Sequence, residues 1–187
     1  MTLFIVLANA AVGMRDGFAR SPQEEWEAAD RLVTRLAPRA FPNLPANLLQ
    51  ELERRGCRVP QSYAGAGRHN VIRGEFAKRG QTDWAVLCSV ERVSSILVFW
   101  NGSQSNPAEL ARSPDRNWLQ TIGGGKIGFS RIIRAVNRKF ILDHNSASGG
   151  PAPPPVDHEG IEDAFAEKGS SVHYFHQQQW IELAGTD

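Results

Sequence analysis

Acidic side chains crowd the segment VDHEGIEDAF at residues 156–165. Asp157, Glu159 and Asp163 offer carboxylate oxygens close together in the chain. Calcium prefers six to eight oxygen ligands, so these carboxylates would supply part of a calcium site that water or a second segment completes. The spacing differs from that of an EF-hand loop. The alternative is a turn capped by an Asp side chain, which leads into a short helical stretch at 161–169 and binds no ion.

Three histidines offer a different metal chemistry. His158, His173 and His176 would bind zinc together with Glu159 if the fold brought them close to one another. Two histidines three positions apart share a face on a helix but point to opposite faces of a strand. The stretch that contains His173 and His176 is aromatic and β-branched, which predicts a strand, so this pair alone does not make a site. The alternative is that each histidine is a surface or hydrogen-bonded residue.

Other catalytic signatures are incomplete. Residues 123–126 read GGGK, but Ile127 stands where a phosphate-binding loop needs Ser or Thr to hold magnesium, so we expect a hairpin tip there. Ser130 lacks the flanking glycines of a nucleophile elbow. Cys88 has apolar neighbours, which indicate a buried thiol rather than a reactive one. The sequence therefore predicts no catalytic residue and, calcium apart, no cofactor.

The chain has two cysteines, Cys57 and Cys88. In an oxidising compartment they would form one disulfide, which would stabilise the fold by about 3 kcal/mol through loop closure. In the cytosol they would be buried thiols. Neither cysteine belongs to a CxxC motif, and no zinc-finger spacing of Cys and His occurs.

The first residues have features of an export signal. An apolar run from Leu3 to Ala8 ends in Ala8-Asn9-Ala10, which has the small-x-small pattern of a signal-peptidase site. A basic leading region is missing, as in a truncated signal, and a buried first strand is the alternative. We expect residues 1–20 to be a truncated signal segment or a disordered arm, and residues 21–187 to be one domain that is periplasmic or secreted, with the cytoplasm as the alternative. No stretch approaches the roughly 20 apolar residues of a membrane span.

Composition limits the partners. Of 187 residues, 41% are hydrophobic and 22% are charged, and the formal net charge is +1. This balance is that of a globular domain and excludes nucleic acid as the main partner, because nucleic-acid-binding domains carry a basic excess. The one dense basic group on predicted strands runs from Arg131 to Lys139. We interpret it as a solvated strand pair, and an anionic ligand surface is the alternative.

Periodicity predicts the elements. A capping-box pattern at Ser21 and Glu24, with Pro22 between them, starts a helix, and Pro38 ends its apolar spacing. The continuous apolar run ILVFW indicates a central strand covered on both faces. The Gly- and Pro-rich segment 146–157 is too poor in backbone donors to join a sheet. The predicted helices are 22–37 and 45–55, with one helical turn at 107–111, and the predicted strands are 70–77, 83–90, 94–101, 129–136, 140–144, 171–176 and 180–183. The fold class is therefore α+β: two N-terminal helices packed on a mainly antiparallel sheet of six to seven strands.

Two segments repeat one pattern. Residues 80–86 (GQTDWAV) and 160–166 (GIEDAFA) both read G-x-x-D before an apolar trio, and a Ser pair follows each of them. We expect the glycine to take a left-handed turn conformation and the aspartate to cap that turn. The pattern resembles the FG-GAP or integrin-α type of β repeat, which implies calcium binding at the acidic loop. The resemblance covers these two short segments, and 187 residues are too few for a propeller of such repeats. The chain as a whole resembles a bacterial exported domain.

Two function classes follow. The first is a non-enzymatic exported domain that binds a protein or a small ligand, with any outward-facing residues among Trp84, Trp100, Trp118 and Trp180 as its contact surface. The alternative is a metal-dependent envelope hydrolase that uses His158, Glu159 and either His173 or His176.

Overall fold

The computed structural model describes residues 21–149 and 151–184. The predicted signal segment at residues 1–20 lies outside the described residues. The described chain is α+β, and each of its four sheets is antiparallel. The helices are α1 (Pro22–Leu32), α2 (Ala46–Arg54) and α3 (Arg138–Ala147), with 3-10 turns η1 (Pro38–Ala40), η2 (Trp100–Gly102), η3 (Asp115–Trp118) and η4 (Gly123–Gly125). The strands are β1 (Arg35–Leu36), β2 (Val59–Pro60), β3 (Val71–Gly74), β4 (Asp83–Val90), β5 (Val93–Phe99), β6 (Ala108–Pro114), β7 (Leu119–Ile122), β8 (Lys126–Phe129), β9 (Arg131–Val136), β10 (Gly160–Phe165), β11 (Gly169–His176) and β12 (Gln179–Ala184).

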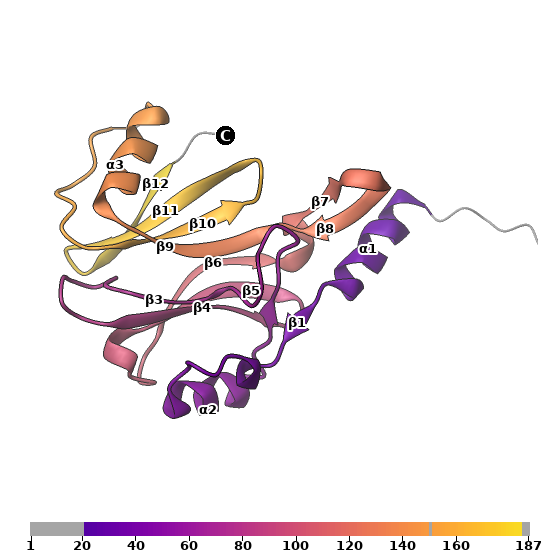
Figure 1. The fold of residues 1–187 in the computed structure, drawn as a ribbon, viewed down its shortest axis with the longest axis horizontal. Coiled ribbons are helices and arrows are strands. Elements are labelled where there is room, and N and C mark those ends of the chain that lie inside the picture. Colours follow the sequence, from indigo (N-terminus) through magenta and orange to yellow (C-terminus); the bar gives the residue numbers. More distant parts are fainter. Residues whose placement is uncertain (1–20, 150, 185–187) are drawn as a thin grey trace, which may run out of the picture.

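The strands do not form the single six- to seven-stranded sheet that the sequence predicts. Two four-stranded sheets form instead, one in the order β3-β4-β5-β6 and the other in the order β12-β11-β10-β9, and β1-β2 and β7-β8 are separate pairs. The two large sheets pack face to face, with α2 against the outer face of the β3–β6 sheet and α3 against the outer face of the β9–β12 sheet (Figure 1). The layers are therefore helix, sheet, sheet and helix.

Side chains that point alternately to the two faces of β4 and β5 explain these layers. In β5, Ile96 and Val98 point between the two sheets, whereas Leu97 and Phe99 point toward α2, and all four are buried. A strand covered on both faces needs apolar residues at every position, which is why ILVFW is continuous. This confirms the prediction that this run is a central strand. The leucines Leu48 and Leu52 of α2 complete the outer layer.

The first helix has the predicted cap and is shorter than predicted. The backbone N–H of Ser21 donates to Glu24 Oε2 at 2.8 Å, and the N–H of Glu24 donates to Ser21 Oγ at 3.3 Å. The helix ends at Leu32 because the chain turns extended at Val33, and Arg35 enters β1. Figure 1 shows α1 lying along the β7–β8 hairpin rather than across the large sheets. The tip of that hairpin is η4, so the hairpin interpretation of the GGGK segment is confirmed.

Three predicted elements are wrong. Residues 140–144 belong to helix α3, not to a strand, because Asn137 caps the helix by accepting from the N–H of Phe140 at 3.0 Å. The helical turn at 107–111 is part of strand β6, which pairs with β5 around a register shift. The helical stretch at 161–169 is instead β10 followed by a turn into β11. Both of these segments are strands because they pair with neighbouring strands, β6 with β5 and β10 with β9 and β11, and this tertiary pairing outweighs the local preference.

The two similar segments adopt different structures. Gly80 has a φ of 80°, and Asp83 caps the turn by accepting from the N–H groups of Phe76 and Ala77 at 3.0 and 2.8 Å. Gly160 instead begins β10, where a Cβ would lie 2.8 Å from Cγ1 of Val172, so a glycine is needed for close packing. The turn prediction is therefore confirmed at residues 80–83 and wrong at residues 160–163.

Candidate functional site

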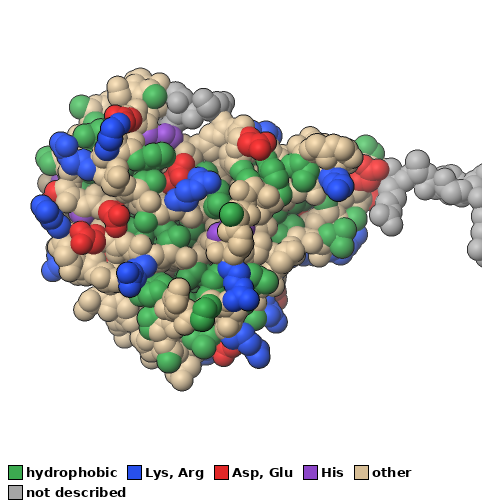
Figure 2. Space-filling view, in the orientation of Figure 1, with side chains coloured by type: hydrophobic (Ala, Val, Ile, Leu, Met, Phe, Trp, Pro, Cys, Tyr) green, Lys and Arg blue, Asp and Glu red, His purple; other side chains and the backbone are tan. Residues whose placement is uncertain are grey.

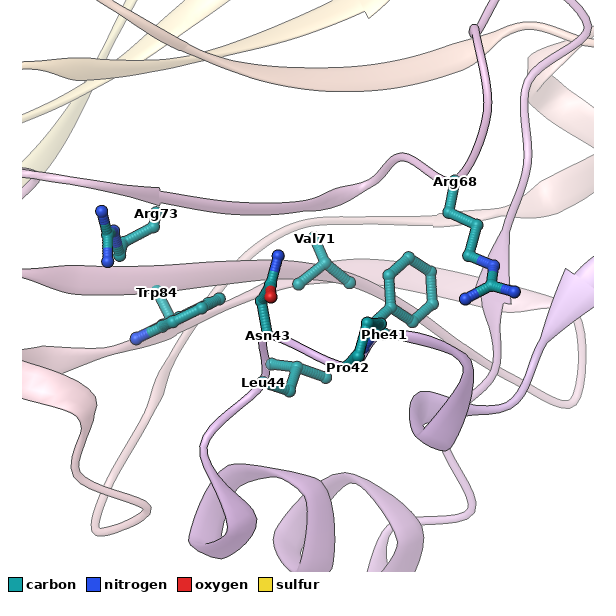
Figure 3. Close-up of a pocket in the computed structure, with 8 residues that line it drawn as sticks. All are labelled: Phe41, Pro42, Asn43, Leu44, Arg68, Val71, Arg73 and Trp84. Atoms are coloured by element: carbon teal, nitrogen blue, oxygen red, sulfur yellow. The ribbon is translucent and has the colours of Figure 1, made fainter.

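A hollow of about 560 Å³ opens between β3, the start of β4 and the loop that leads into α2. We call it the β3 groove. Figure 3 shows its side chains: Phe41, Pro42, Asn43, Leu44, Arg68, Val71, Arg73 and Trp84. In the same orientation as the fold, hydrophobic side chains reach the surface in the region of β3 and α2, with basic side chains beside them (Figure 2).

Strand pairing determines the floor of the β3 groove. Val71 and Arg73 are two positions apart on β3 and therefore share its outer face, and Trp84 of β4 lies directly opposite Arg73. Phe41 and Leu44 close the other side, since the chain between η1 and α2 folds back over the sheet with the N–H of Leu44 donating to the carbonyl of Phe41 at 3.1 Å. The floor is thus aromatic and aliphatic.

The floor rests on a packed layer. Phe41 and Leu44 are buried in the same cluster as Leu48 and Leu52 of α2, and Val71 and Trp84 pack against its edge. That cluster also contains the disulfide between Cys57 and Cys88, whose Cα atoms are 5.3 Å apart, so the predicted disulfide is present. It joins the chain just after α2 to β4. The segment around α2, whose preceding loop forms one wall of the β3 groove, is therefore covalently linked to the sheet that forms the floor.

Two guanidinium groups stand at the ends of the β3 groove. Arg73 lies beside Trp84 at one end, and Arg68 lies beyond Phe41 at the other (Figure 3). Arg68 donates through Nη1 to the carbonyl of Ala40 at 2.5 Å, which fixes its direction. Within residues 21–149 and 151–184, no hydrogen bond or ion pair involves the guanidinium of Arg73, and no carboxylate lines the groove. The site is consequently electropositive over an apolar floor.

A histidine organises the loop that carries Arg68. The backbone N–H of Ser62 donates to His69 Nε2 at 2.6 Å, and His69 Nδ1 lies 3.1 Å from the carbonyl of Gly67. A neutral ring with its proton on Nδ1 satisfies both contacts, because Nε2 then accepts and Nδ1 donates. Burial lowers the pKa of His69 below its ordinary value, and the nearby charge of Arg134 lowers it further. Gln61 holds the same loop by accepting from the N–H of His69 at 3.1 Å.

The predicted calcium ligands do not converge. Asp157 is exposed, and its Oδ1 accepts from the hydroxyl of Tyr174 at 3.1 Å. Glu159 reaches the end of β3, where Oε2 accepts from the N–H of Glu75 at 2.9 Å. Asp163 is buried between the two large sheets. In the part of the chain that the structure describes, no three His, Cys, Asp or Glu side chains gather in a metal-binding group. The calcium site stays a prediction.

Asp163 takes part in a buried ion pair instead. Nε and Nη2 of Arg131 donate to its two oxygens at 2.9 and 2.7 Å, and Arg131 is fully buried. Although burial raises the pKa of the Asp163 carboxyl, His173 and Arg131 outweigh it and hold that pKa below its ordinary value. We assign the larger part to Arg131, because His173 Nε2 lies 3.7 Å from Oδ2, which is longer than a hydrogen bond. Arg131 is thus no part of the solvated strand pair expected from the sequence.

The three histidines of the alternative metal site are also separated. His158 is buried, with Nδ1 and Nε2 each 2.9 Å from a carbonyl oxygen, those of Glu159 and Phe175. His173 and His176 both lie on strand β11, which confirms the predicted strand and places them on opposite faces. His173 faces the sheet interface and His176 is half-buried. Of the three, His158 is hydrogen-bonded within the fold, and His173 lies near the Asp163 carboxylate, with Nε2 3.7 Å from Oδ2.

The sequence signals did not reveal the β3 groove. Trp84 was among the aromatic residues expected at strands, but Arg68 and Arg73 are isolated in the sequence, and Phe41 and Leu44 come from a segment outside the sheet. The one signal available was the alternation of Val71 and Arg73, which places a cation beside apolar residues on one strand face.

Comparison with known proteins adds no relative: no protein family, no curated protein and no solved structure matches the chain. Among the described residues, none of the helices has the length and apolar character needed to cross a membrane.

Proposed function

We propose that the protein is a non-enzymatic, exported binding domain and that the β3 groove is its ligand site. The observation that carries this proposal is the hollow of about 560 Å³ with an aromatic and aliphatic floor, set on a disulfide-linked layer. Ligand sites are typically preformed, mostly apolar hollows of roughly 300–1,000 Å³ with a few polar groups. A hollow of this size fits a small ligand better than the flat face of a protein partner.

Two observations support export. The disulfide between Cys57 and Cys88 is of the kind that persists in oxidising compartments. The apolar run and small-x-small pattern at the start of the chain agree with a periplasmic or secreted location. The alternative of a metal-dependent hydrolase gains no support, because His158, His173 and Glu159 each hold separate structural contacts.

An NMR titration tests the proposal. We would titrate the ¹⁵N-labelled protein with a panel of small aromatic and aliphatic compounds and map the shifted amide and indole signals. Shifts concentrated at Phe41, Leu44, Val71 and Trp84 are expected, since these residues form the floor. Shifts spread over other surfaces, or none with any compound, would contradict the proposal.

A blocking variant provides the matched control. Asn43 is exposed at the rim of the groove, so Asn43→Trp should fill the hollow and abolish binding. Gln50 is an exposed residue of α2 that does not line the groove, so Gln50→Trp adds the same bulk to the same layer and should leave binding unchanged.

A further inference from the structure

We infer that the ligand of the β3 groove carries a carboxylate attached to an apolar body, and that Arg73 binds this carboxylate. This inference rests on the proposed function, since it specifies the chemistry of the same site. The observation behind it is the charge of the side chains that line the groove. This charge is independent of the volume and the apolar floor, on which the proposed function rests.

The first step concerns the availability of Arg73. Its side chain is exposed beside the groove and is engaged in no hydrogen bond or ion pair with residues 21–149 or 151–184. Some exposed arginines have local partners: Arg54 donates to Glu51 at 2.7 Å, and Arg112 donates to Glu109 at 3.3 Å. Arg58, Arg79 and Arg116 are exposed without a side-chain partner among the described residues, but unlike Arg73 they do not line the groove. All the donors of Arg73 therefore remain for a ligand.

The second step concerns selectivity for an anion. The lining contains two guanidinium groups and no Asp or Glu, although the whole chain is close to neutral with a net charge of +1. A planar guanidinium donates two parallel hydrogen bonds to a carboxylate, which makes this pair stronger and more directional than a neutral contact. Trp84 opposite Arg73 provides an apolar surface that excludes water from one side of such a pair.

The third step orients the ligand. Val71 is two residues before Arg73 on the same strand face, and Phe41 and Leu44 lie across from it. A carboxylate at Arg73 would place the remaining part of the ligand over this apolar floor, in the direction of Arg68 (Figure 3). Because Arg68 already donates one N–H to Ala40, it is the weaker anchor and acts on the far end of the ligand.

A matched pair of probes tests the inference. Calorimetric titration would compare 3-phenylpropionate with 3-phenylpropionamide, which has the same shape and no charge. The acid should bind about 10-fold tighter or more, because a hydrogen bond to a charged group contributes more than a neutral one. Equal affinity of acid and amide would overturn the carboxylate inference while the groove stands as a ligand site. Binding of neither probe at the groove residues in the NMR map would overturn the proposed function and this inference with it.

Variants identify the anchor. Arg73→Leu should remove the preference for the acid, and Arg73→Lys should retain part of it, because the charge remains and the paired donors are lost. The control is Arg79→Leu, since Arg79 is exposed in the turn after β3 and does not line the groove. An Arg73→Leu protein that keeps the full preference and a normal thermal melt would contradict the role of Arg73.

A second probe pair assigns the source of the carboxylate. Acetyl-leucyl-phenylalanine with a free C-terminus and its C-terminal amide offer the same chemistry at the end of a peptide. A preference for this acid over its amide, with tighter binding than that of 3-phenylpropionate, supports the inference and assigns the site to peptide C-termini. Weaker binding of this acid than of 3-phenylpropionate assigns the site to small organic acids, and equal binding of the peptide acid and its C-terminal amide would contradict recognition of a peptide carboxylate.

Discussion

Arg131 and Arg73 both lie on strands, yet their surroundings are opposite. Arg131 is fully buried between the two large sheets, with donors to Asp163, to Ser94 and to the carbonyl of Ala111. Its guanidinium also lies 4.3 Å from the ring centroid of Trp118. Arg73 lies at the mouth of a hollow and has no such partner in the described chain. A buried charge persists only when it is paired and hydrogen-bonded, so Arg131 serves the fold, and the unused donors of Arg73 are suited to a ligand.

The largest effect is expected at the buried pair. Asp163→Asn removes the charge that compensates Arg131 and should lower the free energy of unfolding by about 3–5 kcal/mol, as when one partner of a buried ion pair is lost. Urea unfolding monitored by circular dichroism measures this. The double variant Arg131→Met with Asp163→Leu should be more stable than Asp163→Asn, because it leaves no buried charge. A stability of Asp163→Asn within about 0.5 kcal/mol of the parent would show that the pair is not needed by the fold.

The next effect is expected at the disulfide. Cys57→Ala with Cys88→Ala should destabilise the protein by about 3 kcal/mol through loop closure and should also weaken binding in the β3 groove. The second expectation follows from the position of the link, which holds α2 and the wall at Phe41 and Leu44 against β4. Thermal melts and titration of 3-phenylpropionate measure the two effects. Unchanged affinity in the folded double variant would show that the wall is held by packing alone.

The pH dependence of stability should distinguish the contribution of His69 from that of Asp163. Both have lowered pKa values in the folded protein, so each contributes stability above its unfolded pKa that is lost as the pH falls. For His69 the loss begins below its ordinary value of 6.5, and for Asp163 below its ordinary value of 3.8. The contribution of Glu51, whose pKa is lowered to about 2 by its hydrogen bonds from Arg54 and Arg55, is lost only below its ordinary value of 4.5. Stability measured across pH 5 to 7 should therefore decline mainly through His69.

The variant His69→Gln checks this assignment. Glutamine offers an acceptor oxygen and N–H donors without titrating, so the decline between about pH 6.5 and 5 should flatten. His144 is half-buried on α3 and contacts the carbonyl of Ser170 through Nε2 at 3.0 Å, far from the β3 groove in the fold, and His144→Gln is the matched control. A decline that persists in His69→Gln would locate the titrating group elsewhere.

The smallest stability effect is expected at Arg73. Its side chain is exposed and has no partner within the described residues, so Arg73→Leu should change the free energy of unfolding by no more than about 0.5 kcal/mol. The same variant is expected to lose the preference for 3-phenylpropionate over 3-phenylpropionamide. A destabilisation of several kcal/mol would make Arg73 a structural residue like Arg131 and would remove the contrast between the two regions.

Local sequence patterns were sufficient to predict the elements whose structure is determined by the residues within them. The capping box at Ser21, the continuous apolar run of β5 and the last two strands, β11 and β12, all form as predicted. Strand β4 has the predicted bounds, since aromatic and β-branched residues fill it between two turns. These features are encoded within a few neighbouring positions.

Features that depend on distant contacts were not predictable in this way. The segment at 160–165 has the composition of a turn, but it lies between β9 and β11 and pairs with both. From the sequence alone, Asp163 was interpreted as a metal ligand. In the structure it forms an ion pair with Arg131, which is far away in the sequence. The β3 groove likewise combines an N-terminal loop with β3 and β4, and no sequence spacing relates Phe41 to Arg73.

The central claim is that Arg73 holds a carboxylate in the β3 groove. A crystal structure of the protein with 3-phenylpropionate tests it most directly. The account predicts the carboxylate oxygens about 2.7–2.9 Å from the guanidinium nitrogens of Arg73, with the phenyl ring over Val71 and Phe41. A probe bound outside the groove, or bound there with its carboxylate turned away from Arg73, would contradict it.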